Sequence, residues 1–293
     1  MTDVDPGLTP DASPDASPEA TSDASAVAAA WLARFERFDV VGSTNDVVAG
    51  WLRERTPEVC VAIADVQSAG RGREGRTWQA PPGAALLCSV GFRPTWLDVG
   101  HLWRLSAIVS LAMAEACEVA GGLRNGAIHL KWPNDLVIID HATGEVRKLA
   151  GVLGETEGIG SPDAAAVIGI GANVDWARER FPAELASTMT SLTDLSPGRL
   201  VDREVAIHVF LQRLEGLVAA LRNGAFPAET WSHRQLTNGM IVMLDQPDGT
   251  AERVVAEDVD TETGALLVRG TGEDRQRPVV VGEIRHLRVG GIV

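Results

Sequence analysis

The pattern of apolar residues changes near residue 237, and this change constrains the fold more than any other feature of the chain. Upstream, apolar strands of unequal length alternate with long segments of helical periodicity. Downstream, only short alternating strands follow, separated by turn sequences such as Asp248-Gly249. The sequence therefore predicts an α+β fold, with a mixed sheet and flanking helices in residues 27–236 and a small closed barrel in residues 237–293.

The elements of the larger region follow from local signals. Ser43 precedes a segment of helical character and is expected to cap it, while Gly121-Gly122 should end a long amphipathic helix. Strands are expected at 59–66, 84–91, 127–132, 135–140, 148–155 and 164–174, and further helices at 101–120, 202–222 and 227–236. Pro133 forces a sharp turn between two of these strands, and residues 141–147 read as a longer hairpin without an assigned role.

The first 26 residues are acidic, rich in Pro and Ser, and almost devoid of large apolar side chains. Such a segment cannot bury enough surface to offset its ordering entropy, so we expect a disordered tail. The chain shows no secretory signal and no apolar run long enough to cross a bilayer, which favours a cytoplasmic location. The formal net charge of −14 argues against a general nucleic-acid binder.

The cysteines and the lysines lead to different expectations. Cys60, Cys88 and Cys117 lie far apart in apolar stretches, and no Cys or His spacing suggests a metal site, so buried reduced thiols are expected. Of the 26 basic residues only Lys131 and Lys148 are lysines, which leaves 24 arginines. Because lysine is a compact point charge and arginine a planar fork, the two positions indicate either a chemical requirement or compositional drift.

The sharpest local signal is the segment GRGREGRTW at residues 70–78. Its glycines let backbone N–H groups approach a ligand, its arginines concentrate positive charge, and Trp78 can stack on a flat ring. These features suit a loop that folds over a nucleotide, although a solvated basic turn is the alternative. The P-loop pattern is absent, and GIGANV at 169–174 lacks the third glycine of a dinucleotide fingerprint.

A second signal is the segment KWPND at residues 131–135. A lysine at a strand end beside a proline turn can hold a carboxylate and a phosphate oxygen together and stabilise charge on the phosphate. The alternative is a structural ion pair between Lys131 and Asp135.

Five segments together resemble biotin–protein ligases in order and spacing: STN at 43–45, QSAGRGR at 67–73 with Trp78, KWPND at 131–135, KLAGVLGE at 148–155 and GIGANV at 169–174. The resemblance covers about residues 38–290. It implies a fold like that of class II aminoacyl-tRNA synthetases with an SH3-like terminal barrel. It also implies a two-step activity, in which ATP converts biotin to biotinyl-5′-AMP and a carrier lysine then takes the biotin.

The resemblance further implies a role for each matching residue. It assigns the biotin ring, chain and carboxylate to Ser43, Thr44, Asn45, Gln67, Arg71, Gly72, Arg73 and Lys131. It assigns the nucleotide to Arg71, Arg73, Trp78, Lys131, Asn134, Lys148 and Asn173, with Lys131, Arg71 and Arg73 as the catalytic set. No residue need act as a covalent nucleophile.

The resemblance also sets expectations for partners. The substrates are biotin and ATP with Mg²⁺, no metal site belongs to the protein, and the partner is the biotin carboxyl carrier domain of a carboxylase. No helix-turn-helix precedes the catalytic region, so we expect a monofunctional enzyme, monomeric or weakly dimeric, without DNA or membrane binding. The alternatives are a relative that transfers lipoate or octanoate, and a non-catalytic protein that binds biotin or docks a carrier.

Overall fold

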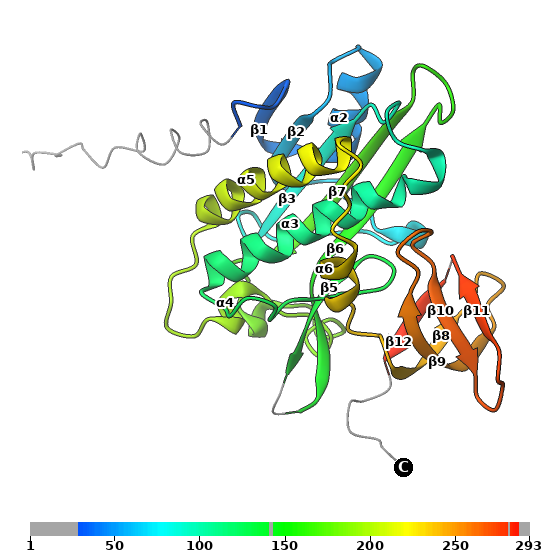
Figure 1. Ribbon diagram of the computed structural model, residues 1–293. Coiled ribbons are helices and arrows are strands. Elements are labelled where there is room, and N and C mark those ends of the chain that lie inside the picture. The colour runs from blue at the N-terminus through cyan, green and yellow to red at the C-terminus, as the bar shows by residue number, and fades with distance from the viewer. Residues whose placement is uncertain (1–28, 141–142, 281, 287–293) are drawn as a thin grey trace, which may run out of the picture.

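The computed structural model describes residues 29–140, 143–280 and 282–286, and a seven-stranded sheet dominates it (Figure 1). In spatial order the strands are β1 (Arg34–Val41), β2 (Cys60–Gln67), β3 (Ala85–Phe92), β7 (Ala165–Asn173), β6 (Glu145–Glu157), β5 (Asp135–Asp140) and β4 (His129–Lys131). β1 and β2 are parallel and all other neighbours are antiparallel. The expected mixed sheet is confirmed.

Strand β1 is the element of this sheet that the sequence did not predict. It lies at the sheet edge and pairs only with β2, and no residue of it is fully buried. Its sequence, RFERFDVV, carries charges at four of eight positions. An edge strand with one partner needs few apolar residues, so it leaves a weak pattern in the sequence.

Helices cover both faces of the large sheet. α3 (Trp103–Gly121) and α5 (Arg203–Arg222) lie together across one face (Figure 1), and α2 (Thr44–Arg53) packs on the other. Successive side chains of β2 point to opposite faces of the sheet. Val61 and Ile63 belong to the core under α3, whereas Cys60 and Ala62 belong to the smaller core under α2. The flanking helices are therefore placed as the sequence indicated.

The helix ends agree with the sequence, but the character of α3 does not. The Ser43 side chain accepts a hydrogen bond from Asn45 N, and Gly122 ends α3 with a φ of 63°, a conformation that glycine adopts without strain. The expected amphipathic helix at 101–120 is wrong in one respect: fourteen of the nineteen residues of α3 are buried. The reason is that α3 packs against α5 as well as against the sheet.

The C-terminal region forms a separate five-stranded antiparallel sheet in the order β11-β10-β9-β8-β12. Its strands are β8 (Met240–Asp245), β9 (Ala251–Val259), β10 (Leu266–Gly270), β11 (Gln276–Val279) and β12 (Glu283–His286). Two short helices, α4 (Leu192–Leu195) and α6 (Ala228–His233), precede it. The small all-strand unit is confirmed, whereas a closed barrel stays a prediction, because no pairing joins β11 to β12 within the described residues.

Several other expectations can be compared with the structure. The three cysteines are buried and unpaired, as expected. The hairpin around residues 141–147 is confirmed by the pairing of β5 with β6, although 141 and 142 themselves lie outside the described residues. The acidic tail of residues 1–26 also lies outside them. No helix in the described ranges is both long and apolar enough to span a membrane.

Candidate active site

A cavity of about 680 Å³ lies on the α2 face of the large sheet. Its volume is typical of sites for small molecules and cofactors. Nearly all the residues singled out in the sequence line it, although they come from distant segments: Ser43, Thr44, Asn45, Gln67, Arg71, Gly72, Arg73, Trp78, Lys131, Asn134 and Lys148. The fold therefore assembles into one site the motifs that the sequence presents separately.

Hydrogen bonds fix the polar residues at one end of the cavity. Gln67 Oε1 accepts from the backbone N of Thr44 at 2.7 Å and from its hydroxyl at 3.0 Å. Beneath them, Ser89 Oγ lies 2.7 Å from Thr44 Oγ1 and 2.6 Å from Asn45 Oδ1. Ser43, Thr44 and Asn45 are all buried. This end presents ordered hydroxyl and amide groups, which can recognise a polar ring.

Asn45 also depends on a glycine of β7. A Cβ atom added at Gly169 would lie 2.2 Å from Asn45 Oδ1, so only glycine leaves room for this side chain. Two residues along the strand, a Cβ at Gly171 would lie 2.5 Å from the Trp78 ring. The GIG sequence of 169–171 thus forms a flat platform for one side chain at each end of the cavity.

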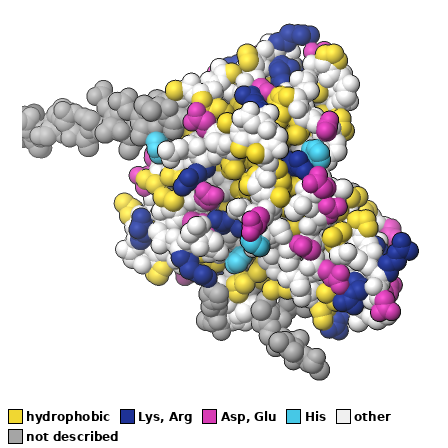
Figure 2. All heavy atoms as spheres, in the orientation of Figure 1, with side chains coloured by type: hydrophobic (Ala, Val, Ile, Leu, Met, Phe, Trp, Pro, Cys, Tyr) yellow, Lys and Arg dark blue, Asp and Glu magenta, His cyan; other side chains and the backbone are white. Residues whose placement is uncertain are grey.

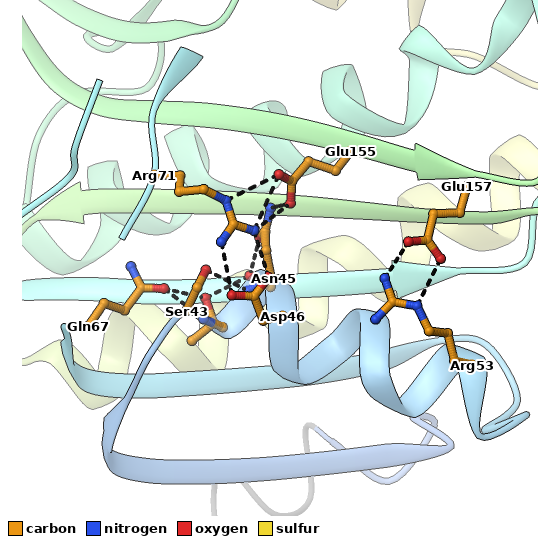
Figure 3. Close-up of polar contacts among 10 residues, drawn as sticks. Ser43, Asn45, Asp46, Arg53, Gln67, Arg71, Glu155 and Glu157 are labelled. Atoms are coloured by element: carbon orange, nitrogen blue, oxygen red, sulfur yellow. Dashed lines mark hydrogen bonds and ion pairs between the residues drawn. The ribbon is translucent and has the colours of Figure 1, made fainter. Parts of the chain in front are cut away.

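Acidic residues anchor the first arginine of the 70–78 loop (Figure 3). The Arg71 guanidinium donates two hydrogen bonds to Asp46, at 2.8 and 2.9 Å, and further ones to Glu155 at 3.1 to 3.3 Å. The hydrogen bond from Arg71 lowers the pKa of Asp46 below its usual value. Asp46 and Glu155 have no local sequence signal for this role, because it depends on the fold bringing them to Arg71.

The rest of the loop folds back on itself and on the KWPND turn. Gly72 N donates to Arg76 O at 2.7 Å, and Trp78 N donates to Gly70 O at 2.9 Å. Arg73 Nη1 donates to Asn134 Oδ1 at 3.4 Å. Arg71, Arg73 and Lys131 all line the cavity, where positive charge can face an anion.

The second lysine supports the indole at the other end of the cavity. Lys148 Nζ lies 2.7 Å from Asp135 Oδ1 and 5.5 Å from the centre of the Trp78 ring. Asp135, the partner considered for Lys131 as a structural alternative, thus pairs with Lys148. Lys131 lines the cavity at the end of β4.

A wall beside Lys148 carries no recognisable sequence motif. It consists of the start of β6 and a segment paired with it, and it contributes Gly144, Glu145, Val146, Leu185, Ser187, Thr188 and Met189 to the cavity. Two backbone hydrogen bonds hold the segments together, from Lys148 N to Thr188 O and from Thr190 N to Lys148 O. The hairpin that had no assigned role therefore contributes to the site.

Asn173 is the one proposed ligand-binding residue that does not line the cavity. Its side chain is fully buried, and its amide donates to Thr190 O at 2.9 Å. It thus supports the segment that follows the cavity wall. The structure places it behind the ligand-facing surface rather than on it.

The 70–78 loop also separates the cavity from a neighbouring groove of about 890 Å³. The groove is lined by the outer side of the loop, by Glu155 and by the β8–β9 turn at Gln246, Pro247 and Gly249. Within the described residues no group of three or more His, Cys, Asp or Glu side chains could hold a metal ion.

Known proteins resemble the chain across both sheets. Residues 37–173 match the Biotin/lipoate A/B protein ligase family. A biotin–[acetyl-CoA-carboxylase] ligase of Mycobacterium tuberculosis is 35% identical over 262 residues, which cover 87% of this chain and 90% of that protein. The chain belongs to the biotin–protein ligase family.

Other members of the biotin–protein ligase family differ in length. The bifunctional ligase/repressor BirA of Bacillus spizizenii is 32% identical over 59% of this chain, and the match spans 50% of that protein. Among solved structures, the biotin protein ligase from Aquifex aeolicus in complex with biotin and ATP superposes with a TM-score of 0.69. That match covers 87% of this chain and 99% of the other at 23% identity, which establishes the shared fold of a mixed sheet with a small antiparallel sheet.

Proposed function

We propose that the protein is an ATP-dependent biotin–[biotin carboxyl-carrier protein] ligase. The observation that carries this proposal is the cavity in which the STN segment, the arginine loop (residues 70–78) and Lys131 meet. A ureido ring needs hydrogen-bonding partners, because a buried polar group without one costs about 1–3 kcal/mol. The ordered groups at Ser43, Thr44, Asn45 and Gln67 meet this need.

The first step joins two anions, the biotin carboxylate and the ATP α-phosphate. Arg71, Arg73 and Lys131 supply positive charge where these anions meet, which favours attack of the carboxylate oxygen on phosphorus with pyrophosphate as the leaving group. Trp78, Asn134 and Lys148 lie toward the proposed nucleotide end. Mg²⁺ would accompany the ATP phosphates rather than occupy a site made by the protein.

The second step transfers biotin to a lysine amine of a carrier domain, with AMP as the leaving group. The names of the relatives support a carboxylase as the source of this domain. The basic and acidic side chains are interspersed on the face shown in Figure 2, and the net charge is −14, both of which favour a ligase that does not bind DNA. A monomer or weak homodimer acting in the cytoplasm, where ATP is available, completes the proposal.

The proposal extends to the organisation of the chain. Residues 27–236 form the catalytic domain, with a fold like that of class II aminoacyl-tRNA synthetases, and residues 237–293 form an SH3-like barrel. Residues 1–26 form a tail outside both. The separate five-stranded sheet supports the second boundary.

Exchange of labelled pyrophosphate into ATP tests the proposed reaction. Biotin should support exchange, whereas lipoate and octanoate should not. Exchange with lipoate at a comparable rate would favour the lipoate-transferring relative. Tight biotin binding without exchange would favour the non-catalytic binding protein.

A further inference from the structure

Glu155 is a carboxylate to which sequence analysis and comparison give no role. It lies two residues beyond Leu153, which lines the cavity, and it lines the neighbouring groove; its Oε2 accepts a hydrogen bond of 2.7 Å from Asn45 Nδ2 (Figure 3). The same carboxylate accepts hydrogen bonds from Arg71 Nη2 at 3.1 Å and Nε at 3.3 Å. One side chain thus joins a residue of the proposed biotin end to a residue of the arginine loop.

These two partners belong to different segments of the chain, although Arg71 is also bound by Asp46, the neighbour of Asn45. Asn45 lies in the first turn of helix α2 and contacts Gly169 and Ser89, whereas Arg71 belongs to the loop between β2 and β3. Glu155 follows Asn45 by 110 residues and Arg71 by 84. A movement of the Asn45 amide is therefore transmitted to the arginine loop by a direct pair of hydrogen bonds.

We propose that Glu155 is a positioning residue that couples occupation of the biotin end of the cavity to the position of the arginine loop beside it. A ligand that hydrogen-bonds to Asn45 restricts its amide, the restricted amide fixes the Glu155 carboxylate, and the carboxylate holds Arg71 over the cavity. The identity of that ligand rests on the proposed function, whereas the link between Asn45 and Arg71 does not.

The chemistry of the carboxylate explains why glutamate is needed. An ionised carboxylate only accepts hydrogen bonds and offers about four lone-pair sites, so it can serve Asn45 and Arg71 together. In Glu155→Gln one oxygen becomes an NH2 group, which would face a donor of one partner or the other. The substitution keeps the size of the side chain and weakens the link at Arg71, because an NH2 group at either oxygen position faces an Arg71 donor.

Arg71 has a second anchor, and this limits the effect of the substitution. Its two hydrogen bonds to Asp46 at the first turn of α2 stay in place when Glu155 changes. The arginine loop should consequently remain attached in the variant but respond less to the biotin end.

The neighbouring pair of Glu157 and Arg53 provides a matched control (Figure 3). Glu157 lies two residues further along β6, and Arg53 Nε donates to it at 3.0 Å, so this pair also joins β6 to α2. Both side chains are exposed, and neither lines the cavity. Glu157→Gln removes the same charge and an ion pair between the same two elements.

Limited trypsin digestion of the full-length variants tests the link. Cleavage after Arg71, Arg73 or Arg76 is followed by mass spectrometry with and without biotin, and biotin binding is measured separately by calorimetry. Without ligand, the loop of Glu155→Gln should be cut about fivefold faster than that of Glu157→Gln, the scale expected for one partly exposed ion pair. Biotin should protect the loop of Glu157→Gln as it does the wild type, and protect that of Glu155→Gln several-fold less.

The outcomes separate the link from the proposed function. Equal cleavage of the two variants without ligand would overturn the positioning role of Glu155, as would full protection of Glu155→Gln by biotin. A wild-type protein that binds no biotin would refute the proposed function, yet the comparison of the ligand-free variants would still decide the role of Glu155.

Discussion

The indole Nε1 of Trp132 donates a hydrogen bond of 3.1 Å to the backbone carbonyl of Gly264. Gly264 belongs to the turn between β9 and β10, which the Asp260 carboxylate shapes by accepting from Glu262 N and Thr263 Oγ1. Trp132 directly follows Lys131 in the chain. The smaller sheet is thereby attached to the turn that carries the proposed catalytic lysine.

This attachment predicts an effect of Trp132→Phe on turnover. Loss of one buried hydrogen bond, worth about 1 kcal/mol, should lower kcat of pyrophosphate exchange about fivefold by loosening the Lys131 turn, with the KM for biotin unchanged. Trp103→Phe is the control, because Trp103 Nε1 donates to Glu262 O of the same turn at 3.4 Å but lies far from Lys131 in sequence. An equal loss of kcat in both variants would show a general effect on packing instead.

Substitution of the two glycines of β7 is expected to affect the two substrates differently. Gly169→Ala places a Cβ against Asn45 and should raise the KM for biotin, whereas Gly171→Ala displaces Trp78 and should raise the KM for ATP. Each change should be at least about tenfold, because side chains packed on the strand cannot yield without losing contacts. Exchange kinetics measure both constants, and each variant controls for the other. A rise in the same KM in both variants would contradict the assigned ends of the cavity.

Lys131→Arg should lower the exchange rate about 100-fold or more. Arginine keeps the charge, but its planar fork does not fit where a compact ammonium faces two anions. Lys148→Arg should cost less, because arginine can still pair with Asp135 and stack on Trp78. Both rates are measured at saturating biotin and ATP. A Lys131→Arg enzyme within threefold of the wild type would refute the proposed role.

The buried thiols predict a dependence on pH. Burial raises the pKa of Cys60 to about 11 and that of Cys117 to about 12, and it also raises the pKa of Cys88. Because the folded values exceed the unfolded value of about 8.5, these thiols stabilise the fold fully below that pH. The stabilisation is lost as the pH rises toward the folded values.

Thiol labelling tests this pH dependence. At pH 8 a disulfide reagent should modify all three cysteines of the denatured protein rapidly and essentially none in the folded protein, since only thiolate reacts. Unfolding by urea should need less denaturant at pH 10.5 than at pH 8. Rapid labelling of Cys88 in the folded state would contradict the expected protection of the buried thiols.

The elements with strong local signals could be predicted from the sequence. The Ser43 cap, the apolar strands and the end of α3 at Gly122 depend on neighbouring residues and were confirmed. The motifs came together in one cavity, because three of them follow the ends of β1, β2 and β4 and the other two lie within the neighbouring strands β6 and β7. Edge strand β1 escaped detection, since its stability comes from β2 rather than from its own pattern.

The residues missed in the site share a dependence on distant partners. Ser89 lies within the wholly buried strand β3 and reads as part of the core. Glu155 reads as a solvated strand end, although it contacts residues 84 and 110 positions away. The wall at 185–189 lacks regular structure of its own. None of these positions has a local signature that could have revealed its place in the cavity.

The order of strands in the large sheet has a consequence for cutting the chain. The β3–β7 ladder separates strands that come entirely from residues 34–92 from strands that come entirely from residues 129–173, and the cavity spans this boundary. The chain passes from the first group of strands to the second through α3 and an exposed turn at Arg124 and Asn125. Two fragments divided at that turn would each carry half of the site. If each fragment were fused to a different protein, ligase activity would report when those two proteins come together.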